Sequence, residues 1–193
     1  MQRIYQEISC EDPELMLEAV EGLIGPQHLE LAEQLDDLAE GEFANGHLPE
    51  AEALWWMVLV IRQKVLGPIH KDVALSLSTL GELYESQGKI SEAASTYRQA
   101  LEIMECNLEP GHPNLAIAVQ RLADVCVIQG DFPQADRLYA KTLSFWQNVL
   151  GANHPAIAAR LERYAELLMT MKEADRAAAL YERAAEIRME NFS

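Results

Sequence analysis

The sequence repeats itself with a period of 42 residues over most of its 193 residues. Histidine recurs at this interval, and so do an alanine column and an aromatic column that follows the alanine by four positions. The three columns are His28, His70, His112 and His154; Ala51, Ala93, Ala135 and Ala177; and Trp55, Tyr97, Tyr139 and Tyr181. A fixed period of this length is typical of proteins built from stacked copies of one supersecondary unit. We therefore divide the chain into an N-terminal segment, 1–24, and four copies, 25–66, 67–108, 109–150 and 151–193.

Each copy has the apolar spacing of two helices. In the second copy, apolar residues recur at steps of three and four over residues 73–84 and again over 90–104. Gly88 lies between the two runs, and glycine accepts the positive φ that commonly ends a helix. Pro113 and Pro155 suit the first position of the first helices in the last two copies. One hairpin has too little partner surface to bury its apolar stripe, so the sequence predicts an all-α array of stacked antiparallel hairpins.

The second copy reads LGPIHKDVALSLSTLGELYESQGKISEAASTYRQALEIME from Leu66 to Glu105. Its LGPxH start, LGELY, QG turn and EA..Y..AL run resemble the 42-residue tetratricopeptide repeat of kinesin light chains and nephrocystin-like bacterial proteins. The resemblance covers about residues 25–190. It implies one right-handed superhelical solenoid, with residues 1–24 as an N-terminal capping helix. It also implies a non-catalytic adaptor or scaffold that binds a partner peptide or helix in a concave groove lined by the first helix of each hairpin.

Helix phase indicates which first-helix side chains face this groove. The expected partner-binding residues are Glu33, Asp36, Asp37, Glu40 and Phe43 in the first copy; Ser78, Thr79, Glu82 and Glu85 in the second; Gln120, Arg121 and Asp124 in the third; and Glu162, Arg163 and Glu166 in the fourth. Apolar or small residues occupy the other groove positions, namely Leu75, Ile117, Val127, Ala159 and Met169. The N-terminal half of the predicted groove is therefore acidic, and Arg121 and Arg163 leave a small cationic spot in the C-terminal half.

The charge of the chain is unevenly distributed. It holds 15 basic and 31 acidic residues, a net charge of −16, and the N-terminal segment and four copies contribute −5, −6, −3, −1 and −1. Carboxylates on one helix face repel each other, so the distribution predicts a Lys/Arg-rich partner segment at the first two copies. The alternative is a solvated face that promotes solubility. The acidic excess argues against binding to nucleic acid or to an anionic membrane.

Other features point away from catalysis, metals and export. The recurring histidines each lie at their own inter-repeat turn, so they cannot converge on a metal and are expected to cap helices. The sequence holds no nucleotide, zinc or redox motif, which predicts no cofactor and no enzymatic activity. Its three cysteines are widely spaced, and no apolar run at the N-terminus resembles a signal peptide or a membrane span. These observations predict a cytoplasmic protein.

Two tryptophans suggest contacts outside the groove. Trp56 and Trp146 share their columns mainly with residues typical of surfaces, so both are expected on the outer face, as partner contacts or lying flat over a neighbouring turn. The final helix, expected over 173–189, carries an apolar stripe with no helix after it. An alternative function is therefore homo-oligomeric assembly, or docking of a regulatory domain, through this helix or the outer tryptophans. The expected state is a monomer or a weak homodimer.

Overall fold

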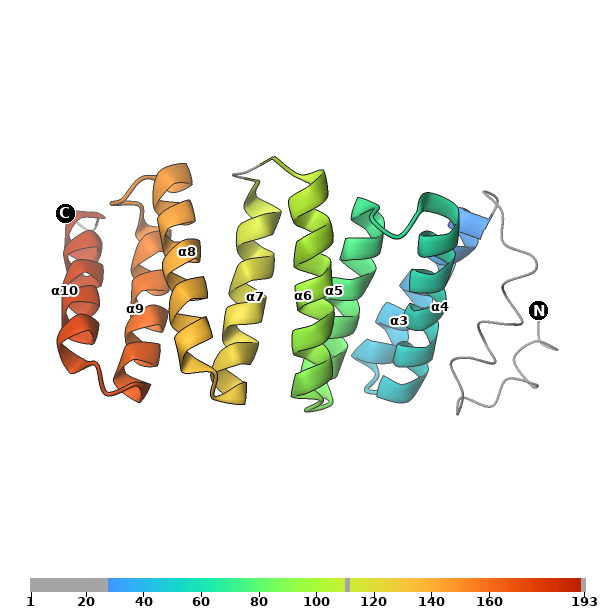
Figure 1. The fold of residues 1–193 in the computed structure, drawn as a ribbon, viewed down its shortest axis with the longest axis horizontal. Helices are drawn as coiled ribbons and strands as arrows, with labels where there is room; N and C mark the ends of the chain where they lie inside the picture. Colours follow the sequence, from blue (N-terminus) through green and yellow to red (C-terminus); the bar gives the residue numbers. More distant parts are fainter. Residues whose placement is uncertain (1–27, 110–111, 192–193) are drawn as a thin grey trace. The chain divides into compact units, whose positions relative to one another are not determined.

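A computed structural model describes residues 28–109 and 112–191, and all of their regular secondary structure is α-helical (Figure 1). The helices are α3 (His28–Ala44), α4 (Leu48–Leu66), α5 (Lys71–Ser86), α6 (Ile90–Asn107), α7 (Pro113–Gln129), α8 (Phe132–Leu150), α9 (Pro155–Thr170) and α10 (Ala174–Asn191). The all-α prediction is confirmed. The capping helix expected over 1–24 lies outside the described residues.

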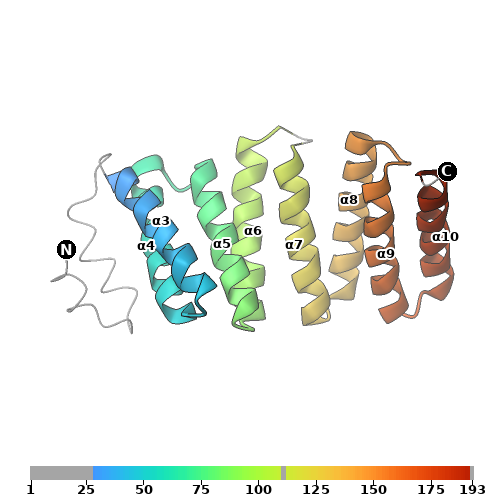
Figure 2. The same cartoon turned by 180° about the vertical axis from the view of Figure 1, so that it is seen from behind.

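Consecutive helices pair as antiparallel hairpins, α3 with α4, α5 with α6, α7 with α8 and α9 with α10 (Figures 1 and 2). The helices divide into two compact units, which we call the N-terminal unit (α3–α6) and the C-terminal unit (α7–α10). Within each unit the second helix of one hairpin packs on the first helix of the next, α4 on α5 and α8 on α9. Each unit is thus two stacked hairpins.

The repeated columns form the cores of these hairpins. Every alanine of the alanine column is fully buried, because a small side chain is needed where paired helices approach closely. Trp55, Tyr97 and Tyr139 of the aromatic column are buried as well, whereas Tyr181 is 40% exposed. Leu38 is 42% exposed, whereas the residues at the corresponding positions of the other copies, Leu80, Leu122 and Tyr164, are buried. The described part of the chain contains no helix before α3.

The turn inside each hairpin uses the left-handed backbone conformation. Gly46, Gly88 and Gly130 have φ values of 82°, 72° and 78°, and in the fourth hairpin Lys172 takes the same conformation with φ 64°. Glycine adopts this conformation without steric cost, whereas a side chain pays roughly 1 kcal/mol. The last turn therefore keeps its geometry although its sequence departs from the glycine column.

The recurring histidines cap the first helices. The Nδ1 atoms of His70, His112 and His154 each accept a hydrogen bond at 3.2 Å from the backbone N–H two residues later. These bonds satisfy amide groups that have no partner inside the helix. The expected capping role is confirmed at these three positions, which explains the strict spacing of the histidines.

Removing one cap is expected to destabilise its helix. For His154→Ala we expect a loss of about 1 kcal/mol in the free energy of unfolding, measured by urea denaturation, because the Ala156 amide loses its acceptor. His154→Asn supplies a side-chain oxygen as acceptor in place of the ring nitrogen and should restore most of that loss. His47 precedes α4 without a side-chain cap bond, and its ring bonds only the Glu42 carboxylate at an exposed position, so His47→Ala serves as the matched control and should change the free energy of unfolding by less than about 0.5 kcal/mol. Equal losses in the two alanine variants would contradict the capping role.

Candidate functional site

The exposed face of α3 carries three carboxylates. Glu33, Asp37 and Glu40 are spaced by four and three residues, which places them on one side of the helix. All three are exposed, and none forms an ion pair or hydrogen bond with another described residue. These side chains are therefore available to an external cation.

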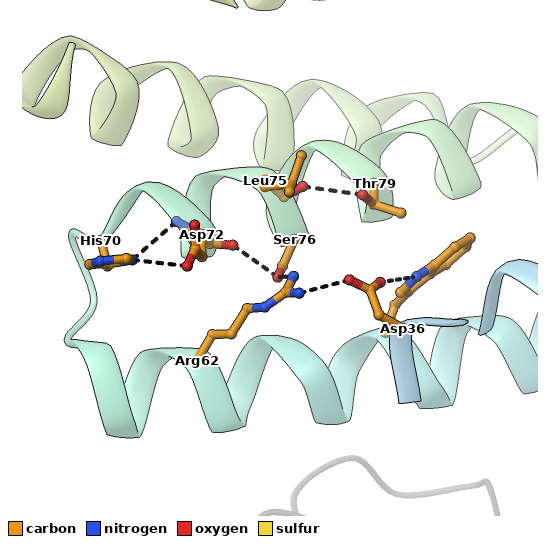
Figure 3. Close-up of polar contacts among 8 residues, drawn as sticks. Asp36, Arg62, His70, Asp72, Leu75, Ser76 and Thr79 are labelled. Carbon is orange, nitrogen blue, oxygen red and sulfur yellow. Dashed lines mark hydrogen bonds and ion pairs between the residues drawn. The ribbon is translucent and has the colours of Figure 1, made fainter. Parts of the chain in front are cut away.

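Asp36 has a different environment from the adjacent Asp37. Its Oδ1 accepts a hydrogen bond from Trp55 Nε1 at 2.9 Å, and its Oδ2 pairs with Arg62 at 2.8 Å. Arg62 also donates to the buried hydroxyl of Ser76 at 2.7 Å, and its side chain is only 11% exposed (Figure 3). Asp36 thus joins α3 to α4 and, through Arg62, to α5. Although predicted in the groove, it has a structural role.

Two further predicted groove acids accept hydrogen bonds from the aromatic column. The hydroxyl of Tyr97 donates to Glu85, and that of Tyr139 donates to Asp124, each at 2.5 Å. Burial raises the pKa of Tyr139, and the hydrogen bond to Asp124 raises it further. Tyr139 therefore stays protonated and acts as a donor at neutral pH. The bonds fasten the second helix of a hairpin to its first helix.

The remaining predicted groove residues of the N-terminal unit offer few free polar groups. Ser78 donates its hydroxyl proton to a carbonyl one turn earlier in α5 at 3.0 Å. Thr79 does the same at 3.2 Å, to the carbonyl of Leu75 (Figure 3). The ring of Phe43 packs against Trp55, with centroids 5.5 Å apart. Glu82 is exposed and Leu75 is largely exposed. The free charge of this face is thus concentrated on α3.

The C-terminal unit contains a pocket of about 380 Å³ between α7 and α9. Six of its lining residues are predicted groove positions: Ile117, Gln120, Arg121, Asp124, Ala159 and Arg163. The other two are Trp146, from α8, and Arg160, from α9. Its volume lies within the range of roughly 300–1,000 Å³ found for ligand sites in proteins. The structure thus brings predicted groove residues of the third and fourth copies together around one pocket.

The pocket lining carries a net positive charge, and its arginines differ in whether they pair with a carboxylate. Asp124 pairs with Arg163 at 2.8 Å and accepts a hydrogen bond from Gln120 at 3.1 Å. Arg160 lies over the ring of Trp146, 4.4 Å from its centroid, and donates to the Ala156 carbonyl at 2.9 Å. Burial lowers the pKa of Arg160. With three arginines and one aspartate, the lining carries a net positive charge in a strongly acidic chain.

The two tryptophans do not lie where the sequence analysis placed them. Trp56 is half-buried, and its indole N–H donates to the hydroxyl of Tyr84 at 3.0 Å, between α4 and α5. Trp146 lies in the pocket rather than on the outer face. Its column includes Arg62 and Arg188, whose guanidinium groups also contact first helices. Late positions of the second helix therefore face the first helices. The use of either tryptophan in partner binding stays a prediction.

Sequence reasoning missed Arg160. Its column holds Gln34, Ser76 and Ala118, and the structure buries Ser76 and Ala118. An arginine in a column of mostly small residues was the one available signal, because such a side chain needs open space beside it. Of the other predicted residues on α9, Glu162 pairs with Arg188 at 2.7 Å, and Glu166 is exposed.

The apolar stripe of α10 is mostly buried. Ala177, Ala184 and Ile187 are fully buried, and Leu180 packs against the cluster of Ala184 and Ile187 with residues of α9. Tyr181 and Met189 remain exposed. The surface expected to support assembly is therefore used largely within its own hairpin.

Residues 28–109 and 112–191 contain no group of three or more His, Cys, Asp or Glu side chains placed to hold a metal ion. Within the same ranges, every helix is too short or too polar to cross a lipid bilayer.

Stacked helical hairpins with this repeat define a class of helical repeat proteins. The family model described as "Tetratricopeptide repeat" matches residues 31–105 and 109–190, so the chain belongs to the tetratricopeptide repeat family. No curated protein matches it.

Many solved structures are similar to this chain, and two of them illustrate the likeness. One is a kinesin light chain-like protein with nearly identical TPR-like repeats from Podosopora anserina, with a TM-score of 0.76, 22% identity, and coverage of 94% of this chain and 86% of that one. The other is BtubC (BKLC) from P. vanneervenii, with a TM-score of 0.72, 24% identity, and coverage of 94% and 70%. At this level of identity the likeness concerns the fold alone.

Proposed function

We propose that this chain is a non-catalytic adaptor whose α3 face binds a Lys/Arg-rich segment of a partner protein. Tetratricopeptide repeat domains are generally protein-interaction modules, and the family is usually non-catalytic. The observation that carries the proposal is the exposed row of Glu33, Asp37 and Glu40, which lacks any cation among the described residues. Neither Cys106 nor Cys126 forms a disulfide within the described residues, which supports a reducing compartment such as the cytoplasm.

Electrostatics supports a basic ligand at this face. Like charges one helical turn apart destabilise a helix by a few tenths of a kcal/mol per pair, and a bound cation removes that repulsion. The first copy carries a net charge of −6, which attracts a basic segment over distances of about a Debye length, roughly 8 Å at physiological ionic strength. A basic ligand therefore gains contacts and also relieves repulsion.

The test compares three capped hexapeptides in which alanine alternates with lysine, glutamine or glutamate. We expect the lysine peptide to bind the full chain and to shift the NMR amide signals of α3. The triple variant Glu33→Gln, Asp37→Asn, Glu40→Gln should bind it at least about tenfold more weakly and lose most of the salt dependence. Asp36 is left intact, because it holds Arg62 and Trp55.

A second triple variant controls for net charge. Glu102, Asp175 and Glu182 are exposed and have no partner among the described residues. Their neutralisation to Gln, Asn and Gln changes the charge of the chain equally, and it should change lysine-peptide affinity by less than about twofold. Equal weakening by both triples would reject a local site in favour of bulk attraction, and equal binding of the glutamine peptide would reject the electrostatic basis.

A further inference from the structure

The two units carry corresponding positions 84 residues apart, with different side chains. In the N-terminal unit Asp36, Arg62 and Ser76 form one connected group, in which the guanidinium of Arg62 pairs with the carboxylate of Asp36 (Figure 3). The corresponding residues of the C-terminal unit are Gln120, Trp146 and Arg160. The guanidinium is thus on a second helix, α4, in the N-terminal unit but on a first helix, α9, in the C-terminal unit. A neutral amide, that of Gln120, stands where the N-terminal unit has the carboxylate of Asp36.

Arg160 consequently lacks the carboxylate that Arg62 has. Its one hydrogen bond goes to the Ala156 carbonyl, and the described residues place no carboxylate within ion-pair distance of it. A guanidinium has five N–H donors, so several remain for another acceptor. Among the described residues that line the pocket, the only anion is Asp124, which is already held by Arg163, Gln120 and Tyr139. A half-buried cation with unused donors therefore lies at the wall of an open pocket.

We propose that this pocket binds an aspartate or glutamate side chain of a partner protein, whose carboxylate pairs with Arg160. The carboxylate would take the part that Asp36 plays for Arg62 in the N-terminal unit, with a guanidinium as the planar, bidentate partner that carboxylates favour. This site is independent of the proposed α3 face. It lies in the other unit and selects the opposite charge.

The surroundings favour a protein segment as the source of the carboxylate. Arg121 and Arg163 are exposed at the pocket and add positive charge, while Ile117 and Ala159 provide exposed apolar surface for neighbouring atoms of a peptide. The third and fourth copies carry net charges of only −1 each, so an acidic segment meets little repulsion there.

The test is an NMR titration of the full chain with the three capped hexapeptides. The indole N–H signal of Trp146 serves as the reporter, because Arg160 lies directly over its ring. We expect the glutamate peptide to shift this signal saturably, and the glutamine and lysine peptides to leave it unchanged. A glutamine peptide with a free C-terminus tests the other carboxylate source and should also be inactive.

Two matched pairs of variants locate the site. Arg160→Gln should weaken the glutamate peptide at least about tenfold, whereas Arg137→Gln, an equal loss of charge at an exposed position of α8, should change its affinity less than about twofold. Ile117 and Ile128 both lie on α7 and are 50% and 60% exposed, but only Ile117 lines the pocket. Ile117→Glu should abolish the Trp146 shift, and Ile128→Glu should retain it.

The outcomes separate this site from the α3 face. Equal binding of the glutamate and glutamine peptides, activity of the free C-terminus alone, or equal effects of the two glutamate substitutions on α7 would each overturn the proposal. Any of these results leaves lysine-peptide binding at α3 untouched. Conversely, loss of lysine-peptide binding in the α3 triple variant should leave the Trp146 response to the glutamate peptide unchanged.

Discussion

Asp36→Ala is expected to lower the free energy of unfolding by about 3 kcal/mol, whereas Asp37→Ala changes it by less than about 0.5 kcal/mol. The two residues are adjacent, of one type and on one helix, but only Asp36 accepts from Trp55 and pairs with Arg62. Removing it leaves a guanidinium that is 11% exposed without its anion, and an indole N–H without its acceptor. Urea denaturation followed by circular dichroism measures the difference.

A double variant separates the ion pair from general packing. Replacing one partner strands the other charge, whereas replacing both with apolar side chains removes the stranded charge. Asp36→Leu combined with Arg62→Met should therefore be more stable than either single variant. Strict additivity of the two single losses would show that the pair is not coupled.

Gly81→Ala is the second substitution for which we expect a large effect, a loss of about 2 kcal/mol. A Cβ atom at position 81 would lie 2.5 to 2.8 Å from three ring atoms of Tyr97. That ring is only 1% exposed, and its hydroxyl is held by Glu85, so it has no free space into which to move. The strain of overpacking, about 1–3 kcal/mol, should exceed what alanine gains in helix propensity.

Gly41→Ala provides a control with the opposite sign. Gly41 lies inside α3, and a Cβ added there would meet nothing within 4 Å. The substitution should raise the free energy of unfolding by up to about 1 kcal/mol through helix propensity alone. Urea midpoints of the two variants should therefore move in opposite directions. A stabilised Gly81→Ala variant would refute the close approach of Tyr97 to α5.

The helical repeat could be predicted from sequence because its period is carried by residues that serve backbone geometry and packing. His70, His112 and His154 recur because each caps a helix, and the alanines recur because two helices approach closely at each of them. Such roles depend on residue type and position in the repeat. They require no knowledge of side-chain conformation, so the repeated positions alone are sufficient to predict the helical hairpins and the resemblance to the repeat family.

The binding surface was less predictable, because helix phase does not determine where a long side chain ends. Asp36 and Asp37 have the same predicted face, yet the reach of Arg62 from α4 places one of them inside. Trp146 was assigned outward on its column, but the end of α8 faces α7 and α9. Whether such a side chain is exposed or held depends on whether a long side chain from a neighbouring helix reaches it. That depends on pairs of residues that are far apart in the sequence.

The hydrogen bonds between the aromatic residues and the acidic residues limit which helices of this chain can be exchanged between hairpins. Trp55, Tyr97 and Tyr139 occupy one column, but their acceptors, Asp36, Glu85 and Asp124, occupy three different ones. A chimera that joined α7 to α6 would place Val127 where the Tyr97 hydroxyl needs Glu85, and Ala123 where its ring needs Gly81. The first three hairpins are thus matched pairs of helices, and an exchange that separates the two helices of one of them breaks its bond.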